Sequence, residues 1–370
     1  MNGIIKKKKK IIFLITGSGV GGAEIVVKNL IFNIDQDKFN PIFVSIRPLG
    51  IIGEEIGKNF KTFSLMADKK FNPLFLLRLF SIIRKEEPDI LHCHLFHANF
   101  LGRIIGKILG VPFIISTVHS DNFGGTFRYF LLKITDFLND FTVVVSKKIE
   151  EDLIKRKIVP ISKIKIIYNG VEDGGDFINK LDIDTLKKEL KINNKYPIIL
   201  SVGRLMPVKG HIYLIRAISL LIKKYPDLRL LLIGDGSERM NLEAESTKLG
   251  LNNNILFLGE IIKTEPYYRL ADIFVLPSIN EGFGLAIVEA ISNKLLVVAS
   301  NVGGIPEIIK NNINGFIVNP EDYIMLSKKI DHILEMNNHE KEKIIDTAYN
   351  DFKNNFSLKR MLNQYNSLYN

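Results

Sequence analysis

The chain of 370 residues has one cysteine and no apolar run long enough to cross a membrane. The single cysteine, Cys93, excludes an intramolecular disulfide and fits the reducing environment of the cytoplasm. A membrane-spanning helix needs about 18 or more apolar residues, so we expect none. Lysines at 6–10 before the apolar residues 11–15 imitate a signal peptide. That apolar stretch is short and lacks a small-residue cleavage site, so we expect a first β-strand there.

An acidic residue is missing where a dinucleotide-binding site would need one. Residues 17–22 match G-x-G-x-x-G after an expected strand. An NAD site also requires an acid at the end of the second strand, but that strand, residues 42–46, ends in Arg47. An arginine would still suit NADP, so an NAD(P)-dependent oxidoreductase stays an alternative. We favour a glycine-rich loop whose backbone approaches the donor diphosphate or an acceptor, and a purely structural tight turn is the alternative.

The net charge of +10 is unevenly distributed. Residues 1–175 contain 26 Lys and Arg against 17 Asp and Glu, whereas residues 176–370 contain 24 against 23. A basic half suggests an acidic partner, and an anionic membrane surface attracts clustered Lys and Arg. A generally lysine-rich surface is the alternative. Nucleic acid is less favoured, because no binding motif accompanies the charge.

Short apolar runs alternate with helical patterns along the whole chain, which is typical of parallel sheets covered by helices. The first series of expected strands comprises residues 11–16, 41–46, 89–93, 113–118 and 141–145. The second comprises residues 197–202, 228–233, 254–258, 272–276, 295–299 and 315–318. Polar, glycine-rich residues 168–175 between them suit a hinge. The sequence therefore predicts an α/β fold of two doubly wound, Rossmann-like domains facing a central cleft, with ligands at the carboxyl ends of the strands.

Residues 281–289, Glu-Gly-Phe-Gly-Leu-Ala-Ile-Val-Glu, follow one of these strands and hold two carboxylates. Gly282 and Gly284 predict a helix start, where bare backbone N–H groups form an anion site. Within one helix, Glu281 and Glu289 would lie roughly 12 Å apart along the axis and line one cleft. An anion between two hydroxyl-binding carboxylates suits a nucleotide sugar. An ordinary helix with a solvated glutamate at each end explains the two acids as well.

Four further motifs accompany this segment. They are Gly21-Gly22-Ala23-Glu24, the strand-ending His119, Gly203-Arg204-Leu205 followed by Lys209-Gly210, and Gly303-Gly304-Ile305-Pro306-Glu307. In order and spacing, the five motifs together resemble the signature of the retaining glycosyltransferases of family 4, which have the GT-B fold. The resemblance covers nearly the whole chain.

The resemblance implies a domain organisation and a set of roles. An acceptor-binding domain would span residues 1–172, completed by a C-terminal helix at about 353–370 that crosses back to it. A nucleotide-sugar-binding domain would span residues 173–352. Glu281 would contact the transferred sugar, and His119 would lie near its reacting carbon. The donor-binding residues would be Gly22, Gly282, Phe283, Gly284, Glu289, Gly303 and Gly304, with Glu289 on the ribose hydroxyls.

Arg204 and Lys209 favour a reaction without a metal. Arginine binds a diphosphate through paired hydrogen bonds and lysine as a point charge, and both would stabilise the departing nucleotide. That role rests on the resemblance, because surface charge at a helix start explains the two cations from the sequence alone. No Asp-x-Asp motif stands at a suitable strand end, so we expect no metal cofactor. No second nucleophile is apparent, which favours front-face retention over a covalent intermediate.

His92, His94 and His97 cluster around Cys93 at the end of one expected strand, a composition that could bind zinc. Alternation along the strand places Cys93 on the opposite face from His92 and His94. We therefore favour a cleft-lining or structural role for these histidines over a zinc site.

Other functions stay open from the sequence. A sugar-nucleotide epimerase of the same fold would bind the same donor, and a non-enzymatic binding module is less favoured. For a glycosyltransferase, we expect a saccharide or lipid-linked acceptor in the assembly of cell-surface polysaccharide, lipopolysaccharide or glycolipid. We expect a cytoplasmic enzyme that makes peripheral contact with the anionic inner face of the plasma membrane. Residues 71–83 and 127–138 would form interfacial helices there, or else core helices packed on the sheet.

Overall fold

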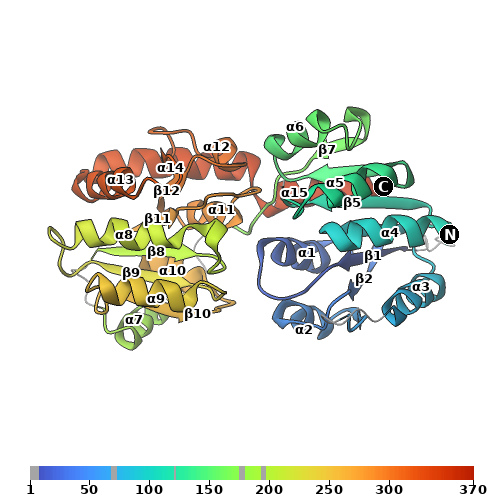
Figure 1. Cartoon of the computed structure of the whole chain (residues 1–370), viewed down its shortest axis with the longest axis horizontal. Coiled ribbons are helices and arrows are strands. Elements are labelled where there is room, and N and C mark those ends of the chain that lie inside the picture. The colour runs from blue at the N-terminus through green and yellow to red at the C-terminus, as the bar shows by residue number, and fades with distance from the viewer. Residues whose placement is uncertain (1–7, 68–72, 121, 175–179, 193–196) are drawn as a thin grey trace, which may run out of the picture. The chain divides into compact units, whose positions relative to one another are not determined.

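The computed structural model describes residues 8–67, 73–120, 122–174, 180–192 and 197–370, and the chain divides into two compact units (Figure 1). Unit 1 comprises Met1–Asn169 and Lys359–Asn370, and unit 2 comprises Gly170–Leu358. Each unit is an α/β sandwich around one parallel sheet, which confirms the predicted fold class. Parts of three predicted features, residues 6–7, 71–72 and 175, lie outside the described residues.

Unit 1 is built on a seven-stranded parallel sheet with the order β3-β2-β1-β4-β5-β6-β7. Its strands are β1 (Lys9–Ile15), β2 (Phe39–Ser45), β3 (Lys61–Ser64), β4 (Ile90–His94), β5 (Phe113–Val118), β6 (Phe141–Val144) and β7 (Ile164–Ile166). Its helices include α1 (Gly22–Asn33), α2 (Ile51–Gly57), α3 (Leu74–Glu86), α4 (Phe96–Ile108), α5 (Thr126–Thr135) and α6 (Lys147–Lys155), with short 3₁₀ turns η1 (Asp136–Leu138) and η2 (Ile161–Lys163). Strand β1 is apolar and buried from Ile11 to Ile15, because helices cover both faces of the sheet.

Unit 2 is built on a six-stranded parallel sheet with the order β10-β9-β8-β11-β12-β13. Its strands are β8 (Ile198–Val202), β9 (Arg229–Ile233), β10 (Ile255–Gly259), β11 (Ile273–Leu276), β12 (Leu296–Ser300) and β13 (Phe316–Val318). Its helices include α7 (Lys180–Glu189), α8 (His211–Leu221), α9 (Arg239–Lys248), α10 (Glu265–Leu270), α11 (Leu285–Ser292), α12 (Ile305–Ile308), α13 (Tyr323–Glu335) and α14 (Asn338–Asn355), and the 3₁₀ turn η3 (Pro207–Lys209) precedes α8. Strands β8, β11 and β12 are neighbours, so the loops that follow them meet at one edge of the sheet.

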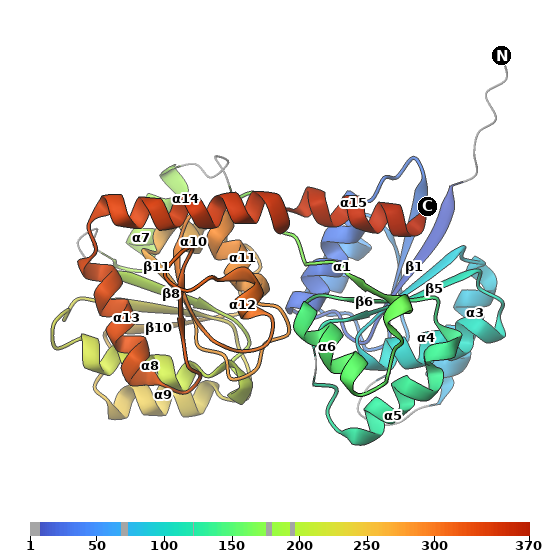
Figure 2. The same ribbon diagram turned by 90° about the horizontal axis from the view of Figure 1, so that it is seen from above.

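The C-terminal helix α15 (Leu358–Tyr369) packs with unit 1, as the fold class predicts. Its Tyr369 hydroxyl lies 2.7 Å from Nδ1 of His92 on β4, and Lys9 donates a 2.9 Å hydrogen bond to the carbonyl of Tyr369. Figure 2 shows α3, α4 and α5 on the opposite side of this sheet from α15. The buried Cys93 points to that opposite side, where its Sγ abuts Gly102 of α4. The alternation expected for His92 and Cys93 is therefore present.

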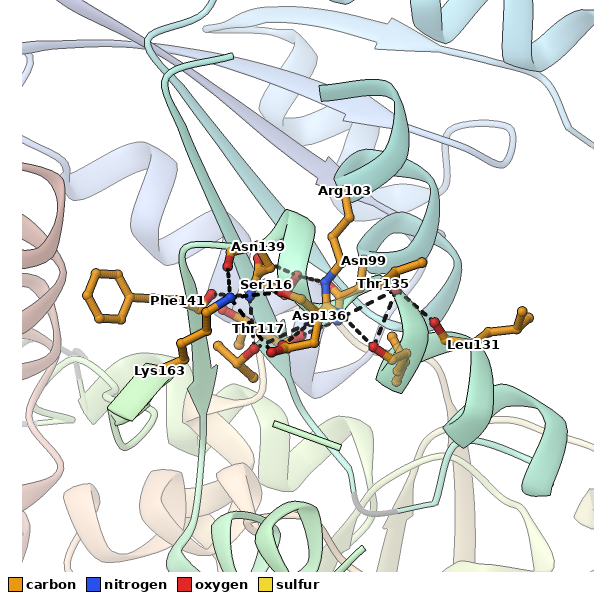
Figure 3. A network of polar contacts seen from close by, with 12 residues as sticks. Asn99, Arg103, Ser116, Thr117, Leu131, Thr135, Asp136, Asn139, Phe141 and Lys163 are labelled. Atoms are coloured by element: carbon orange, nitrogen blue, oxygen red, sulfur yellow. Dashed lines mark hydrogen bonds and ion pairs between the residues drawn. The ribbon is translucent and has the colours of Figure 1, made fainter. Parts of the chain in front are cut away.

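A buried arginine ties α4 to α5 and to two strands (Figure 3). Arg103 on α4 is 1% exposed, and its Nε donates to Ser116 Oγ of β5 at 2.9 Å. One terminal nitrogen donates to the carbonyl of Leu132 at 3.0 Å, and the other lies 3.8 Å from a carboxylate oxygen of Asp136. Burial raises the pKa of Asp136, while the charges of Arg103 and Lys163 oppose that rise. The network fixes the inner side of α5 and η1 to the core.

We predict that Arg103→Met lowers the free energy of unfolding by about 3–5 kcal/mol, because Asp136 then keeps only Lys163 as a cation and the buried acceptors of Arg103 lose their donor. Urea denaturation followed by circular dichroism measures the loss. Arg84→Met, at an exposed arginine of α3, is the control and should change stability by less than about 0.5 kcal/mol. A loss below about 1 kcal/mol in Arg103→Met would contradict the anchoring role.

Candidate active site

Lys209 and Glu281 are brought together at the carboxyl edge of the unit 2 sheet. Lys209 ends the 3₁₀ turn after β8, and Glu281 lies in the loop after β11. Nζ of Lys209 is 2.6 Å from Oε2 of Glu281, and the two side chains are 20% and 14% exposed. The backbone reinforces this approach, since the N–H of Ile279 donates to the carbonyl of Val208 at 2.8 Å. The sequence singled out both residues but not their pairing.

The loop after β12 contacts the backbone of Glu281. Gly303, in the loop after β12, has a φ of 54°, and a Cβ there would lie 1.5 Å from the carbonyl oxygen of Glu281. The N–H of Gly304 donates to the same carbonyl at 3.3 Å. Only glycine permits both the positive φ and this close approach. Gly303 and Gly304 therefore set the position of the Glu281 backbone.

Helix α11 begins later than the sequence pattern predicts. Its first residue is Leu285, and Gly284, with a φ of 103°, is the N-cap. Glu281 therefore lies in the loop, and the helical spacing calculated from Glu281 to Glu289 does not apply. Gly282 and Gly284 are buried, and the Phe283 ring packs at 5.8 Å from that of Phe356. Since Phe283 is 3% exposed, a ligand at this loop would meet its backbone rather than its ring.

Glu289 lies on α11 and has a partner that the sequence did not indicate. The hydroxyl of Tyr268, on α10, donates a 2.8 Å hydrogen bond to Oε2 of Glu289. Tyr268 is 1% exposed. Burial raises the pKa of Glu289 to about 7, although the hydrogen bond from Tyr268 opposes the rise. Glu289 therefore changes its charge near neutral pH, which is typical of functional carboxylates.

Arg204 lies in the loop between β8 and η3, and its side chain is exposed. The loop is held by the neighbouring strand, because the N–H of Gly203 donates to the carbonyl of Ile233 at 2.9 Å. A Cβ at Gly203 would have the side chains of His211 and Lys209 4.0 Å away. Arg204 thus lies in the same segment after β8 as Lys209, but it makes no ion pair with another described residue.

His119 follows β5 in unit 1 and contacts a second histidine. Its Nε2 lies 3.0 Å from Nδ1 of His94, the last residue of β4. Burial lowers the pKa of His119 to about 4, so its ring is neutral at neutral pH. His94 Nε2 is buried and has no hydrogen-bond partner among the described residues. His94 therefore fixes one nitrogen of His119 and leaves Nδ1 of His119 as the nitrogen outside this pair.

The glycine-rich segment at 17–22 joins β1 to α1, and Gly22 is the first residue of that helix. Ser18 holds the segment, because its Oγ accepts a 3.0 Å hydrogen bond from the N–H of Gly50. A Cβ at Gly50 would lie 2.8 Å from the backbone of Gly19, so the two loops are in direct contact. This packing shows why glycine is required at position 50.

Three basic side chains gather near the carboxyl edge of the unit 1 sheet, a group that sequence reasoning missed. Arg128 of α5 lies over the Phe96 ring at 5.0 Å, and burial together with the charges of Arg128 and Arg47 lowers the pKa of His97. Arg47 follows β2 and is exposed. Arg47 lies in a loop, His97 on α4 and Arg128 on α5, so the group is formed by the fold and has no signal in the sequence. Two fixed positive charges near a neutral imidazole suit an anionic group.

The described part of the chain offers no cluster of three or more His, Cys, Asp or Glu side chains arranged to hold a metal ion. A zinc site formed by the histidines of β4 would lack the Cys93 thiolate as a ligand, because Cys93 faces α4 while His92 faces α15. Within the same residues, no helix has both the length and the apolar character that crossing a bilayer requires.

Comparison with known proteins places both units in one family. Residues 20–174 match the model "Glycosyltransferase Family 4", and residues 182–351 match "Glycosyl transferases group 1". The UDP-Gal:alpha-D-GlcNAc-diphosphoundecaprenol alpha-1,3-galactosyltransferase of Escherichia coli is 32% identical over 71% of this chain and 69% of its own length. The capsular polysaccharide biosynthesis glycosyltransferase CapM of Staphylococcus aureus is 27% identical over 80% of each chain.

Solved structures agree with the fold. The glycosyltransferase from Rickettsia africae superposes with a TM-score of 0.83 at 26% identity and covers 98% of both chains. Anabaena HepE, solved with UDP and glucose, has a TM-score of 0.85 at 21% identity, over 97% of this chain and 99% of its own. These matches do not favour an epimerase or an oxidoreductase. The chain belongs to the group 1, family 4 glycosyltransferases of GT-B fold, and it is a glycosyltransferase.

Proposed function

We propose that this glycosyltransferase moves a sugar from a nucleotide sugar to a lipid-linked saccharide with retention of the anomeric configuration, in the assembly of a surface polysaccharide or glycolipid. The observation that supports this proposal most strongly is the ion pair of Lys209 and Glu281. Nζ of Lys209 lies 2.6 Å from Oε2 of Glu281, and the two residues come from the loops after the adjacent strands β8 and β11. A cation paired with a carboxylate suits a ligand that joins a diphosphate to a sugar. HepE, solved with UDP-glucose, supports a nucleotide-sugar donor.

Four residues of unit 2 have a part in this proposal. Lys209 and Arg204 bind the diphosphate and stabilise the negative charge that it gains on departure. Glu281 accepts hydrogen bonds from hydroxyls of the transferred sugar, and Glu289 does the same for the ribose. The bond from the anomeric carbon to the phosphate oxygen breaks while the acceptor oxygen bonds to the same face of that carbon. The acceptor proton passes to the departing phosphate oxygen.

Unit 1 supplies the acceptor side of the proposal. His119 is neutral and offers a ring nitrogen to sugar hydroxyls. Arg47 and Arg128 suit the diphosphate of a lipid-linked acceptor, the chemistry named for the Escherichia coli relative. Such an acceptor places the enzyme at the cytoplasmic face of a membrane. No protein-bound metal has a part in this scheme, because cations of the chain neutralise the diphosphate.

The direct test incubates the purified enzyme with a panel of nucleotide sugars and a short-chain diphosphate-linked saccharide. We predict transfer that survives EDTA and a product whose anomeric proton coupling matches that of the donor in NMR spectra. The inverted anomer would contradict retention. A strict need for added Mg²⁺ or Mn²⁺ would show that a metal neutralises the leaving group.

We predict that Glu281→Ala lowers kcat on the order of 100-fold or more while the Kd for the nucleoside diphosphate changes less than about ten-fold. Sugar contacts strengthen in the transition state, whereas the nucleotide is bound by other residues. Glu245→Ala is the matched control, because Glu245 forms a 2.8 Å ion pair with Arg216 elsewhere in unit 2. Steady-state kinetics and calorimetry separate the two quantities.

Gly303→Ala tests the same position without altering a charged group, and it should also lower kcat because its Cβ displaces the Glu281 carbonyl. Gly250→Ala is its control, since Gly250 also has a positive φ, of 72°, but has open space around its Cβ position. Near-normal turnover in both Glu281→Ala and Gly303→Ala would refute the assignment of Glu281.

We predict that nucleotide binding weakens as the pH falls through the pKa of Glu289, which is about 7. Ribose hydroxyls donate to the charged carboxylate, so its protonation removes the acceptor. From this group alone, affinity should be roughly ten-fold lower at pH 6 than at pH 8. Glu289→Gln should bind weakly at both pH values and show only the titration of the diphosphate itself. Equal pH profiles in the two proteins would exclude Glu289 from the nucleotide site.

A further inference from the structure

Helix α5 presents an apolar outer face. Its exposed large side chains are Phe127, Phe130 and Ile134, which are 69%, 55% and 45% exposed. Phe137 of the following turn η1 is 75% exposed. The spacing of 127, 130 and 134 places these side chains on one side of the helix. Leu132 and Thr135, on the other side, are buried. The helix therefore has two apolar faces, and one of them is uncovered.

The aromatic content of this face is unusual within the chain. The sequence has 24 phenylalanines, and the exposed ones among the described residues are Phe127, Phe130 and Phe137. In the adjoining helices, Leu77 of α3 is 67% exposed and Ile108 of α4 is 68% exposed. Exposed apolar residues scattered singly need no explanation, but an aromatic stripe on one helix marks an interaction surface.

Helices α3, α4 and α5 together carry a strong positive charge. Outside the core their basic residues are Arg78, Arg84, Lys85, Lys107, Arg128 and Lys133, whereas Arg103 is buried beside Asp136, and their acidic residue is Glu86. Glu86 is buried and bound to Lys61 of β3 at 2.7 Å, so its charge is already compensated. Lys133 is exposed on α5 among the apolar residues, and Lys107 is exposed next to Ile108. An apolar stripe bordered by lysines complements an anionic surface with an apolar interior.

The inner side of α5 is anchored, which keeps its outer face outward. Arg103 binds the carbonyl of Leu132 and, at 3.5 Å, the hydroxyl of Thr135 (Figure 3). Asp136, the first residue of η1, is held by Arg103 and Lys163. The outer aromatic side chains therefore cannot turn into the core without breaking this network. They are exposed in the folded protein, so they can bind another surface without a conformational change of α5.

We propose that α5 and η1 dock this enzyme on an anionic lipid bilayer, with Phe127, Phe130, Ile134 and Phe137 inserted at the headgroup boundary. The charge favours this occupant over a second copy of the chain, because two copies would bring together two basic surfaces. The inference rests on the proposed lipid-linked acceptor, and it adds the position of the bilayer. Arg128 belongs to the docked helix, so the Arg47 and Arg128 group would lie near the headgroups, where the diphosphate of such an acceptor resides.

The test is sedimentation with vesicles of phosphatidylglycerol and phosphatidylcholine, without donor or acceptor sugars. The variant Phe127→Ala/Phe130→Ala/Phe137→Ala should bind at least about ten-fold more weakly than the wild type. Its control, Ile161→Ala/Met240→Ala/Ile313→Ala, removes three exposed apolar side chains elsewhere and should bind normally. Since all six side chains are exposed, the thermal transitions should match that of the wild type.

The charge is tested separately. Lys107→Gln/Lys133→Gln should lower vesicle affinity on the order of 20-fold, at about five-fold per lysine. Lys248→Gln/Lys263→Gln, at exposed lysines of unit 2, has the same net charge and should bind like the wild type. Binding should weaken at high salt and on pure phosphatidylcholine.

Undiminished binding of the triple phenylalanine variant would overturn the docking proposal. So would a wild-type dimer that the same variant dissociates, because the stripe would then be an interface between copies. The outcome is independent of catalysis. Vesicle binding through α5 without sugar transfer would refute the proposed function alone, and transfer to a short-chain acceptor without vesicle binding would refute the docking alone.

Discussion

The close approach of two backbones at Gly303 is the constraint on which the unit 2 site depends. A carbonyl oxygen and a Cα can come this close only where no Cβ stands between them, and the positive φ of Gly303 is one that glycine adopts without strain. The loop after β11 is thus fixed on one side by its contact with the loop after β12. From the other side, the N–H of Ile279 binds Val208 in the loop after β8. Glu281 and Lys209 then meet without either loop having to adjust.

Buried polar groups are treated differently in the two units. In unit 1, the cation of Arg103 has several acceptors around it, and Lys163 supports the same acidic residue. A connected network of this kind stiffens a core. In unit 2, Glu289 accepts from the hydroxyl of Tyr268, and burial raises its pKa although this hydrogen bond opposes the rise. An acid with unused acceptor capacity is suited to a ligand, because the ligand supplies the hydrogen bonds that the protein withholds.

The central strands and the motif residues could be predicted because their chemistry is local. Strands buried on both faces appear as continuous apolar runs, and every strand predicted that way is present. Strands β3 and β7 were missed because they lie at the two edges of the unit 1 sheet, where short strands alternate with polar residues. The start of α11 was misplaced by four residues, since the Gly-Phe-Gly segment folds as a loop tied to distant backbone. Tyr268 beside Glu289 and the Arg47–Arg128 group have no signal in sequence spacing. The sequence also could not separate an interfacial helix from a core helix at residues 127–138, because α5 is apolar on both sides.

The return of α15 to unit 1 has a consequence for how this chain acquires its structure during synthesis. The side of β4 that carries His92 is covered by Tyr365 and Tyr369, and Lys9 of the first strand binds the carbonyl of Tyr369 across 360 positions of sequence. Unit 2 is continuous from Gly170 to Leu358 and can fold as soon as it leaves the ribosome. Unit 1, although its sheet is translated first, keeps an uncovered aromatic face until the final helix emerges. The domain that is made first is therefore the one that is completed last, and during that interval its uncovered aromatic face favours aggregation.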